Sequence, residues 1–315
     1  MIADLGGGVH RVTQRLPWAL DHVHCYAIED PQGWTIVDTG LGTPGTLARW
    51  KEALTELGSP RVWRIVLTHY HPDHLGASAS LVELTEAEEV VQGTHDAVLT
   101  RHAWGSERDL DAFQDYLKLH GMPAALAESS TSDEEGLLVR AAAPTRLVEE
   151  GDLVEIAGER FEVLVLPGHA DGHITLFGER TGRMFGGDVI LDEITPNVGR
   201  WEDTRPDPLG AYLATLDRLS ELRPAIVYPG HKRTIEDTPA RAKEIREHHD
   251  IRLTETEEAL GSGAETTYDV VLAIWGDQLG FHERRVALVE TISHLERLER
   301  PGRARGVEPG RWRAS

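Results

Sequence analysis

The chain has 315 residues, of which 53 are acidic and 32 basic, so its formal charge is -21 at pH 7. This acidic balance argues against a nucleic-acid-binding protein, because phosphate backbones are bound by clustered lysine and arginine. The N-terminus lacks the apolar run of a signal peptide and no 18 apolar residues run together, so we expect no membrane contact. The single cysteine, Cys25, cannot form an internal disulfide, which favours a cytoplasmic protein. The length predicts about two domains.

The first part of the chain predicts strands and helices in alternation. Residues 24–30 and 34–40 are β-rich runs joined by a Pro-Gln-Gly turn, which predicts a hairpin, and residues 46–58 have helical spacing. Residues 61–69 form a nearly continuous apolar run, as expected of a strand buried on both faces. A short strand at residues 88–93, after a further helix, completes a predicted βαβ unit.

Residues 95 to about 145 differ in character from the segments before them. Helical runs separated by glycine and proline replace the strand pattern. The polar run 129–136 is expected to be an exposed loop. We interpret the whole segment as a helical insertion over or beside the functional site.

The strand pattern returns after residue 150, and each of its three segments ends in a potential metal ligand: residues 152–169, 174–188 and 225–231. Beyond about residue 235 the composition is helical, and residues 300–312 predict a short hairpin. We therefore divide the chain into a larger domain, residues 1–234, which carries these potential ligands, and a small three-helix domain of winged-helix type, residues 235–315.

Seven histidines and aspartates lie where strands end. Four of them fall within six residues after the strand predicted at 61–69, where open α/β sheets place their sites: His69, His71, Asp73 and His74. Three more follow three separate strands, beside glycines that permit tight turns: His169, Asp188 and His231. This density and placement predict a metal site, and one such loop can serve two adjacent metal positions.

Five motifs in order carry a resemblance to a known family: VDTG with Asp38, THYHPDH, LPGH, GGD and YPGH. Over about residues 10–235 the chain resembles the metallo-β-lactamase superfamily. The resemblance implies an α/β fold, an αββα sandwich with a two-metal site at its edge. It implies one metal held by His69, His71 and His169, and another held by Asp73, His74 and His231, with Asp188 bridging. Asp38 would orient ligands or bound water, unless it only forms a turn.

Nitrogen and oxygen ligands suit two Zn²⁺ ions first, with iron or manganese as alternatives. Two such ions can share a hydroxide, because coordination lowers the pKa of water from about 15.7 to near 7. We expect this bridging hydroxide to attack a carbonyl or phosphoryl centre. The expected catalytic residues are Asp73, which accepts the hydrogen bond of the hydroxide, and Asp38.

An aspartate at position 188, after Gly-Gly, resembles the thioesterase, lactonase and phosphodiesterase branches of the superfamily rather than its β-lactamases. We predict hydrolysis of a small-molecule acyl substrate, either a thioester or an ester/lactone. The loop 195–208 and the insertion are expected to shape its pocket, the insertion through Trp104, Phe113, Tyr116, Leu117 and Met122.

The C-terminal part resembles the winged-helix extension of the β-lactamase-like protein 2 group, some members of which cut single-stranded RNA. A metal-dependent endoribonuclease or phosphodiesterase is therefore the alternative, although the acidic charge opposes it. A third hypothesis is a partner-binding protein with a vestigial metal site. The C-terminal helices could pair subunits of a homo-oligomer, and His248 and His249 are expected to be ordinary polar positions on a charged helix.

Overall fold

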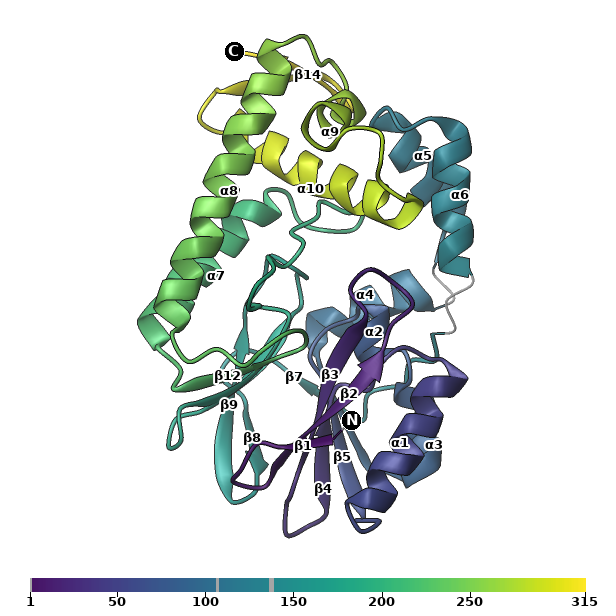
Figure 1. The fold of residues 1–315 in the computed structure, drawn as a ribbon, viewed down its shortest axis with the longest axis vertical. Helices are drawn as coiled ribbons and strands as arrows, with labels where there is room; N and C mark the ends of the chain where they lie inside the picture. Colours follow the sequence, from purple (N-terminus) through teal and green to yellow (C-terminus); the bar gives the residue numbers. More distant parts are fainter. Residues whose placement is uncertain (1, 106–107, 136–138) are drawn as a thin grey trace.

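Two β-sheets form the middle of the molecule in the computed structural model, which describes residues 2–105, 108–135 and 139–315 (Figure 1). One sheet has seven strands in chain order: β1 (Ile2–Asp4), β2 (Val9–Arg15), β3 (His22–Ile28), β4 (Trp34–Val37), β5 (Val62–Leu67), β6 (Glu89–Gly93) and β7 (Arg146–Val148). The other has five, in the order β12 (Ile226–Pro229), β11 (Arg183–Gly187), β10 (Ile174–Gly178), β9 (Glu159–Val165) and β8 (Leu153–Ile156).

Strand pairing follows the hydrophobic pattern. The predicted hairpin is confirmed, since β3 and β4 pair antiparallel with Tyr26 opposite Val37. Strand β5 is parallel to both β4 and β6, and its Ile65 and Val66 point to opposite faces yet are both fully buried. The apolar run therefore forms an internal strand covered on both sides, as predicted.

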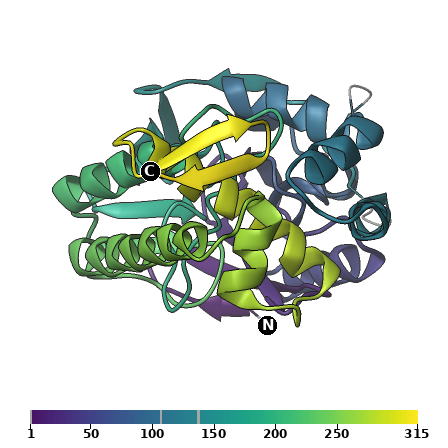
Figure 2. The ribbon, with the colours of Figure 1, turned by 90° about the horizontal axis from the view of Figure 1, so that it is seen from above.

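Helices cover the outer face of each sheet, so the predicted αββα sandwich is confirmed. On the seven-stranded sheet lie α1 (Pro44–Glu56), α3 (Ser78–Thr85) and α4 (Thr94–Trp104), and on the five-stranded sheet α7 (Pro208–Leu222) and the long α8 (Thr238–Gly261) (Figures 1 and 2). Side-chain caps begin several of these helices; Asp207, for example, accepts a hydrogen bond from the backbone N–H of Gly210 at 2.9 Å. Within the described ranges, no helix has the length and apolar character needed to cross a membrane.

The inner faces of the two sheets pack against each other. Val66 and Val91 of the seven-stranded sheet share a buried cluster with Val163 and Leu176 of the five-stranded sheet. Burying such side chains contributes roughly 1.5–3 kcal/mol each. This apolar layer holds the sheets together, and the loops that leave their strands meet at one edge of it.

The insertion contains α5 (Leu110–Leu119) and α6 (Ala124–Glu135), which lie beside α9 (Thr267–Trp275) and α10 (Phe281–Glu299) beyond the strand ends (Figure 1). The expected loop at 129–136 is wrong for residues 129–135, which belong to α6, while Gly136 lies outside the described residues. Contact with α10 explains the difference: Arg285 Nη1 donates to the backbone oxygen of Ser130 at 3.0 Å. Tertiary packing here outweighs a weak local helix preference.

The C-terminal region has the predicted three helices α8, α9 and α10, followed by a hairpin of β13 (Ala304–Glu308) and β14 (Arg311–Ala314) (Figure 2). Its assignment as a winged helix and the boundary between residues 234 and 235 stay predictions. One buried cluster crosses that boundary, joining Leu216 of α7 to Ile245 of α8 and Leu295 of α10. The expectation for His249 is wrong, because its side chain is fully buried where α8 packs on α10.

Candidate metal centre

All seven predicted ligand residues meet at the edge of the sandwich. The loop after β5 carries His69 and His71 and leads into the one-turn helix α2 (Pro72–Leu75), which holds Asp73 and His74. The other three residues follow β9, β11 and β12 of the opposite sheet: His169, Asp188 and His231. Strand ends from both sheets thus bring together residues that are up to 162 positions apart.

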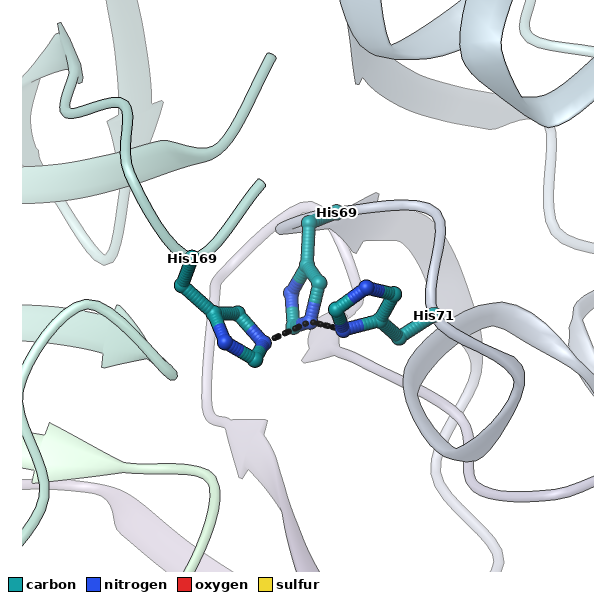
Figure 3. A group of neighbouring side chains, drawn as sticks. All are labelled: His69, His71 and His169. Carbon is teal, nitrogen blue, oxygen red and sulfur yellow. Dashed lines mark hydrogen bonds between the residues drawn. The ribbon is translucent and has the colours of Figure 1, made fainter. Parts of the chain in front are cut away.

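Three histidines form the first group. The Nε2 atom of His69 lies 3.1 Å from Nδ1 of His71 and 3.3 Å from Nε2 of His169 (Figure 3). A tetrahedral zinc ion with bonds of about 2.0–2.1 Å holds its ligand atoms about 3.3 Å apart. The two separations from His69 match this spacing, and the ligand atoms of all three residues lie within 4.8 Å of one another, so a metal-binding role for them fits the geometry.

Asp73, His74 and His231 form the second group, with ligand atoms within 4.8 Å of one another. Asp188 touches both groups. One of its oxygens, Oδ2, lies 3.2 Å from Nε2 of His231 and 3.7 Å from Nε2 of His169, and Oδ1 lies 3.4 Å from Nε2 of His74. This is the position in which a carboxylate can contact two neighbouring cations.

Hydrogen bonds behind these histidines fix their rings. Nδ1 of His74 lies 2.8 Å from Oδ2 of Asp38, whose carboxylate also accepts the backbone and hydroxyl hydrogens of Thr68. Nδ1 of His169 donates to the carbonyl of Asn197 at 2.8 Å, and Nδ1 of His231 donates to that of His22 at 2.6 Å. With Nδ1 occupied, the other nitrogen of each ring faces the centre as a potential ligand.

The histidines of the centre differ in pKa according to whether burial or the neighbouring carboxylates dominate. Burial, reinforced by the neighbouring histidines, lowers the pKa of His69 well below its ordinary value, so its ring is neutral and has a lone pair to offer. Burial also lowers the pKa of His231, but Asp188 and Asp73 outweigh it and raise this pKa to about 10. The carboxylates therefore attract positive charge, whether protons or metal ions carry it.

Sequence reasoning missed two residues that support the centre. Nε2 of His173 accepts the backbone N–H of Asp188 at 3.1 Å, and its ring stacks on that of His69 with centroids 4.7 Å apart. His173 is the second histidine of the LPGHADGH motif, and its place in that motif could have indicated a role at the centre. Asp96, on α4, accepts the backbone N–H of Tyr70 at 2.9 Å and so holds the histidine loop from behind, and no local pattern marks it.

A cavity of about 820 Å³ opens directly onto this centre. Five of the seven residues line it: His71, Asp73, His169, Asp188 and His231. Its walls come from α4 and α5, from residues 194–204 and from α10, and they include Trp104, Phe113 and Trp201. The insertion and the connection before α7 therefore shape the cavity as expected, but the contribution of α10 was not predicted.

Three of the expected pocket residues do not line the cavity within the described residues. Leu117 and Met122 are buried against α9 and α10 instead, and Tyr116 packs beside them and donates its hydroxyl to the carbonyl of Arg200 at 2.7 Å. The reason is the amphipathic character of α5: one face packs on the C-terminal helices, and only the other faces the cavity.

Known proteins share this sequence pattern and fold. The sequence profile of the metallo-beta-lactamase superfamily matches residues 18–231. The crystal structure of the metallo-beta-lactamase family protein TTHA1429 from Thermus thermophilus has a TM-score of 0.87 and 31% identity, covering 99% of this chain and 100% of that one. The probable metallo-hydrolase YqjP of Bacillus subtilis (strain 168) is 29% identical, over 90% of this chain and 89% of that protein. Acyl-coenzyme A thioesterase MBLAC2 of Gallus gallus is 27% identical, over 72% of this chain and 78% of that protein.

Proposed function

Because the chain belongs to the metallo-β-lactamase superfamily of metallo-hydrolases, we propose that it hydrolyses an acyl substrate, a thioester or an ester/lactone, with two divalent metal ions. The observation that carries this proposal is the cavity, which is walled by tryptophan and phenylalanine side chains and ends on five of the seven candidate ligands. The thioesterase name of the Gallus gallus relative supports the same bond type.

The proposed ligands are the two groups described above, with Asp188 between them. When bound, such ions lower the pKa of water to near 7 and polarise the oxygen of a substrate carbonyl. The protein orients the ligands: Asp38 holds His74, and the carbonyls of Asn197 and His22 hold His169 and His231. Zinc is the first candidate for these nitrogen and oxygen ligands, with iron or manganese as alternatives.

Asp73 is the residue that we place nearest to the reacting atoms. It lies in the cavity wall, with Oδ2 3.4 Å from Nε2 of His231. Although burial opposes its ionisation, His74 and His231 hold its pKa at about 2, so the carboxylate accepts hydrogen bonds at neutral pH. It can orient an attacking water molecule, and the apolar walls exclude other water from the site.

The charges around the cavity weigh against the nuclease alternative. Apart from the candidate ligands, the part of the lining that the structure describes has five carboxyl groups and two guanidinium groups: Asp109, Glu202, Asp203, Glu283 and Glu290 against Arg108 and Arg285. A polyanionic backbone is attracted by the opposite balance. An uncharged acyl group suits these walls better.

Metal removal tests the proposal. The purified protein is stripped with a chelator, reloaded with Zn²⁺, and assayed on acyl thioesters, lactones, aryl esters, phosphodiesters and single-stranded RNA. We expect about two zinc ions to restore hydrolysis of an acyl compound. Activity that survives complete metal removal contradicts the mechanism, and a preference for RNA or phosphodiesters replaces the proposed substrate class with the alternative.

A further inference from the structure

A second cluster of potential metal ligands lies outside the centre described above, where α8 packs on α10. His249 comes from α8, whereas Glu290 and His294 are four residues apart on α10 and share one face of that helix. One ligand atom from each lies within 4.8 Å of the other two. Both histidines are buried, with 0% and 1% of their surface exposed.

The ring of His294 is held in the orientation of a metal ligand. Its Nδ1 donates a hydrogen bond of 2.8 Å to the backbone carbonyl of Glu290, so the neutral ring carries its lone pair on Nε2. That Nε2 lies 3.3 Å from Nδ1 of His249. The separation matches the roughly 3.3 Å expected between two nitrogens on a tetrahedral zinc ion. Histidines that bind metals are commonly anchored through their second nitrogen in this way.

The acidic member of the cluster has a single hydrogen-bond partner among the described residues. The carboxylate of Glu290 accepts one hydrogen bond, from Nδ2 of Asn197 at 3.2 Å, and no described lysine or arginine pairs with it. Burial raises the pKa of Glu290 to about 7. Ionising this half-buried carboxyl group is therefore costly even with the charge of Arg252 nearby, and a bound cation would offset that cost.

We propose that His249, Glu290 and His294 bind a divalent transition-metal ion, zinc in the first place, at a site separate from the two-metal centre. Two imidazole nitrogens and a carboxylate are a frequent zinc ligand set, which leaves one position for water. The ion ties α8 to α10 and so holds α10 in place as a wall of the cavity, which Glu290 also lines. This proposal does not depend on which substrate the two-metal centre hydrolyses.

Counting bound zinc tests the site directly. The stripped full-length protein is titrated with Zn²⁺, and we expect one more tightly bound equivalent in the wild type than in His294→Ala or Glu290→Gln. Because the Glu290→Gln change preserves side-chain volume, this variant should fold as the wild type does. The matched control is His248→Ala, the partly buried neighbour of His249 on the same helix, which should bind as many ions as the wild type.

A measurement on the unaltered protein completes the test. Crystals of the wild type grown with stoichiometric zinc should show an anomalous scattering peak between His249, Glu290 and His294, besides the scattering at the two-metal centre. Loss of the extra ion should also lower the midpoint of thermal unfolding. Equal zinc counts in wild type and both variants, or no peak between these residues, would show that the cluster is a hydrogen-bonded histidine pair and would overturn the proposal.

Discussion

The metal-binding edge of the sandwich and the wall of the cavity above it are assembled in different ways. Every candidate ligand at the edge follows a strand end, and four of them lie within six residues. The wall combines helices α4 and α5 with residues 194–204 and with α10, segments that meet only in the folded chain. The reactive groups are therefore encoded by short local motifs, whereas substrate recognition is encoded by long-range packing.

The two regions also differ in the forces that hold them. Buried histidines and carboxylates at the edge depend on one another, and in the proposed function on a bound cation, so small displacements there are costly. The wall is held mainly by apolar packing, such as the buried cluster that Leu117 shares with Val271 and Leu288. Changes at the edge should therefore abolish metal binding and turnover, while changes in the wall should alter substrate preference and stability.

The largest effect is expected from Gly230→Ala, because this glycine lies against two candidate ligands. An added Cβ would lie 2.3 Å from Oδ1 of Asp188 and 2.5 Å from Cε1 of His74, closer than any side chain tolerates. We expect metal affinity and kcat to fall by more than about 100-fold, which exceeds the usual loss on removing a residue that hydrogen-bonds to a metal ligand. Metal analysis and turnover measure this. The control Gly261→Ala, with open space around its Cβ, should behave as the wild type.

A smaller effect at the same edge is expected from Asp38→Asn. In the wild type, the carboxylate of Asp38 accepts a hydrogen bond from Nδ1 of His74. The amide of asparagine can instead donate its N–H to Nδ1, and the ring proton of His74 would then be on Nε2, the nitrogen that faces the centre. We expect metal affinity to fall by about 10–100-fold. Competition with a chelating dye measures it, and Asp217→Asn, at an exposed position of α7 far from the centre in sequence, is the control. Unchanged metal affinity would show that Asp38 only forms a turn and does not orient His74.

Outside the cavity lining, where the end of α5 meets α9, His120 should make the contact between the insertion and α9 sensitive to acid. Its Nδ1 lies 3.1 Å from Oγ1 of Thr267, its carbonyl accepts the N–H of Tyr268 at 3.0 Å, and burial lowers its pKa to about 4. The unfolded chain, with a histidine pKa of about 6.5, binds more protons below that pH. The stability that neutral His120 contributes is therefore complete above pH 6.5 and is lost as pH falls toward 4.

We expect His120→Gln to lose about 2 kcal/mol less stability than the wild type between pH 7 and pH 5. Denaturant unfolding at the two pH values measures the difference, with metal binding at pH 7 as a check that the edge of the sandwich is intact. Parallel pH profiles of the two proteins would contradict the assignment.

The smallest effect is expected from Phe113→Ala, which enlarges the cavity without touching a candidate ligand. Phe113 lines the cavity and its ring centroid lies 5.9 Å from that of Trp201. Because the Phe113 side chain is only partly buried, we expect kcat/KM for substrates with long acyl chains to fall by about tenfold, mainly because KM rises. For substrates with short acyl chains we expect little change. The control Leu119→Ala, exposed at the end of the same helix, should match the wild type. Equal losses for all chain lengths would place Phe113 outside the acyl site.

From the sequence, the five motifs and the family resemblance that they carry allowed the αββα sandwich to be predicted, and the placement of the seven candidate ligands at strand ends allowed their meeting to be predicted. Apolar strand patterns and glycine turns are local properties, and strand ends in an open sheet converge on one edge. Strands β1, β2 and β7 were not predicted. Each is at or near a rim of the seven-stranded sheet, and β1 and β7 have only three residues each, too few for a clear alternation of polar and apolar side chains.

Only the tertiary structure decided how the wall is built and which histidines are buried. Leu117 and Met122 carry no local sign that they pack on α9 and α10 rather than facing the cavity. His249 is surrounded in sequence by charged residues, yet it is fully buried because α10, some forty residues later, packs against that face of α8. Burial of this kind depends on contacts between distant segments, and these are determined by the packing of the whole core rather than by any local pattern.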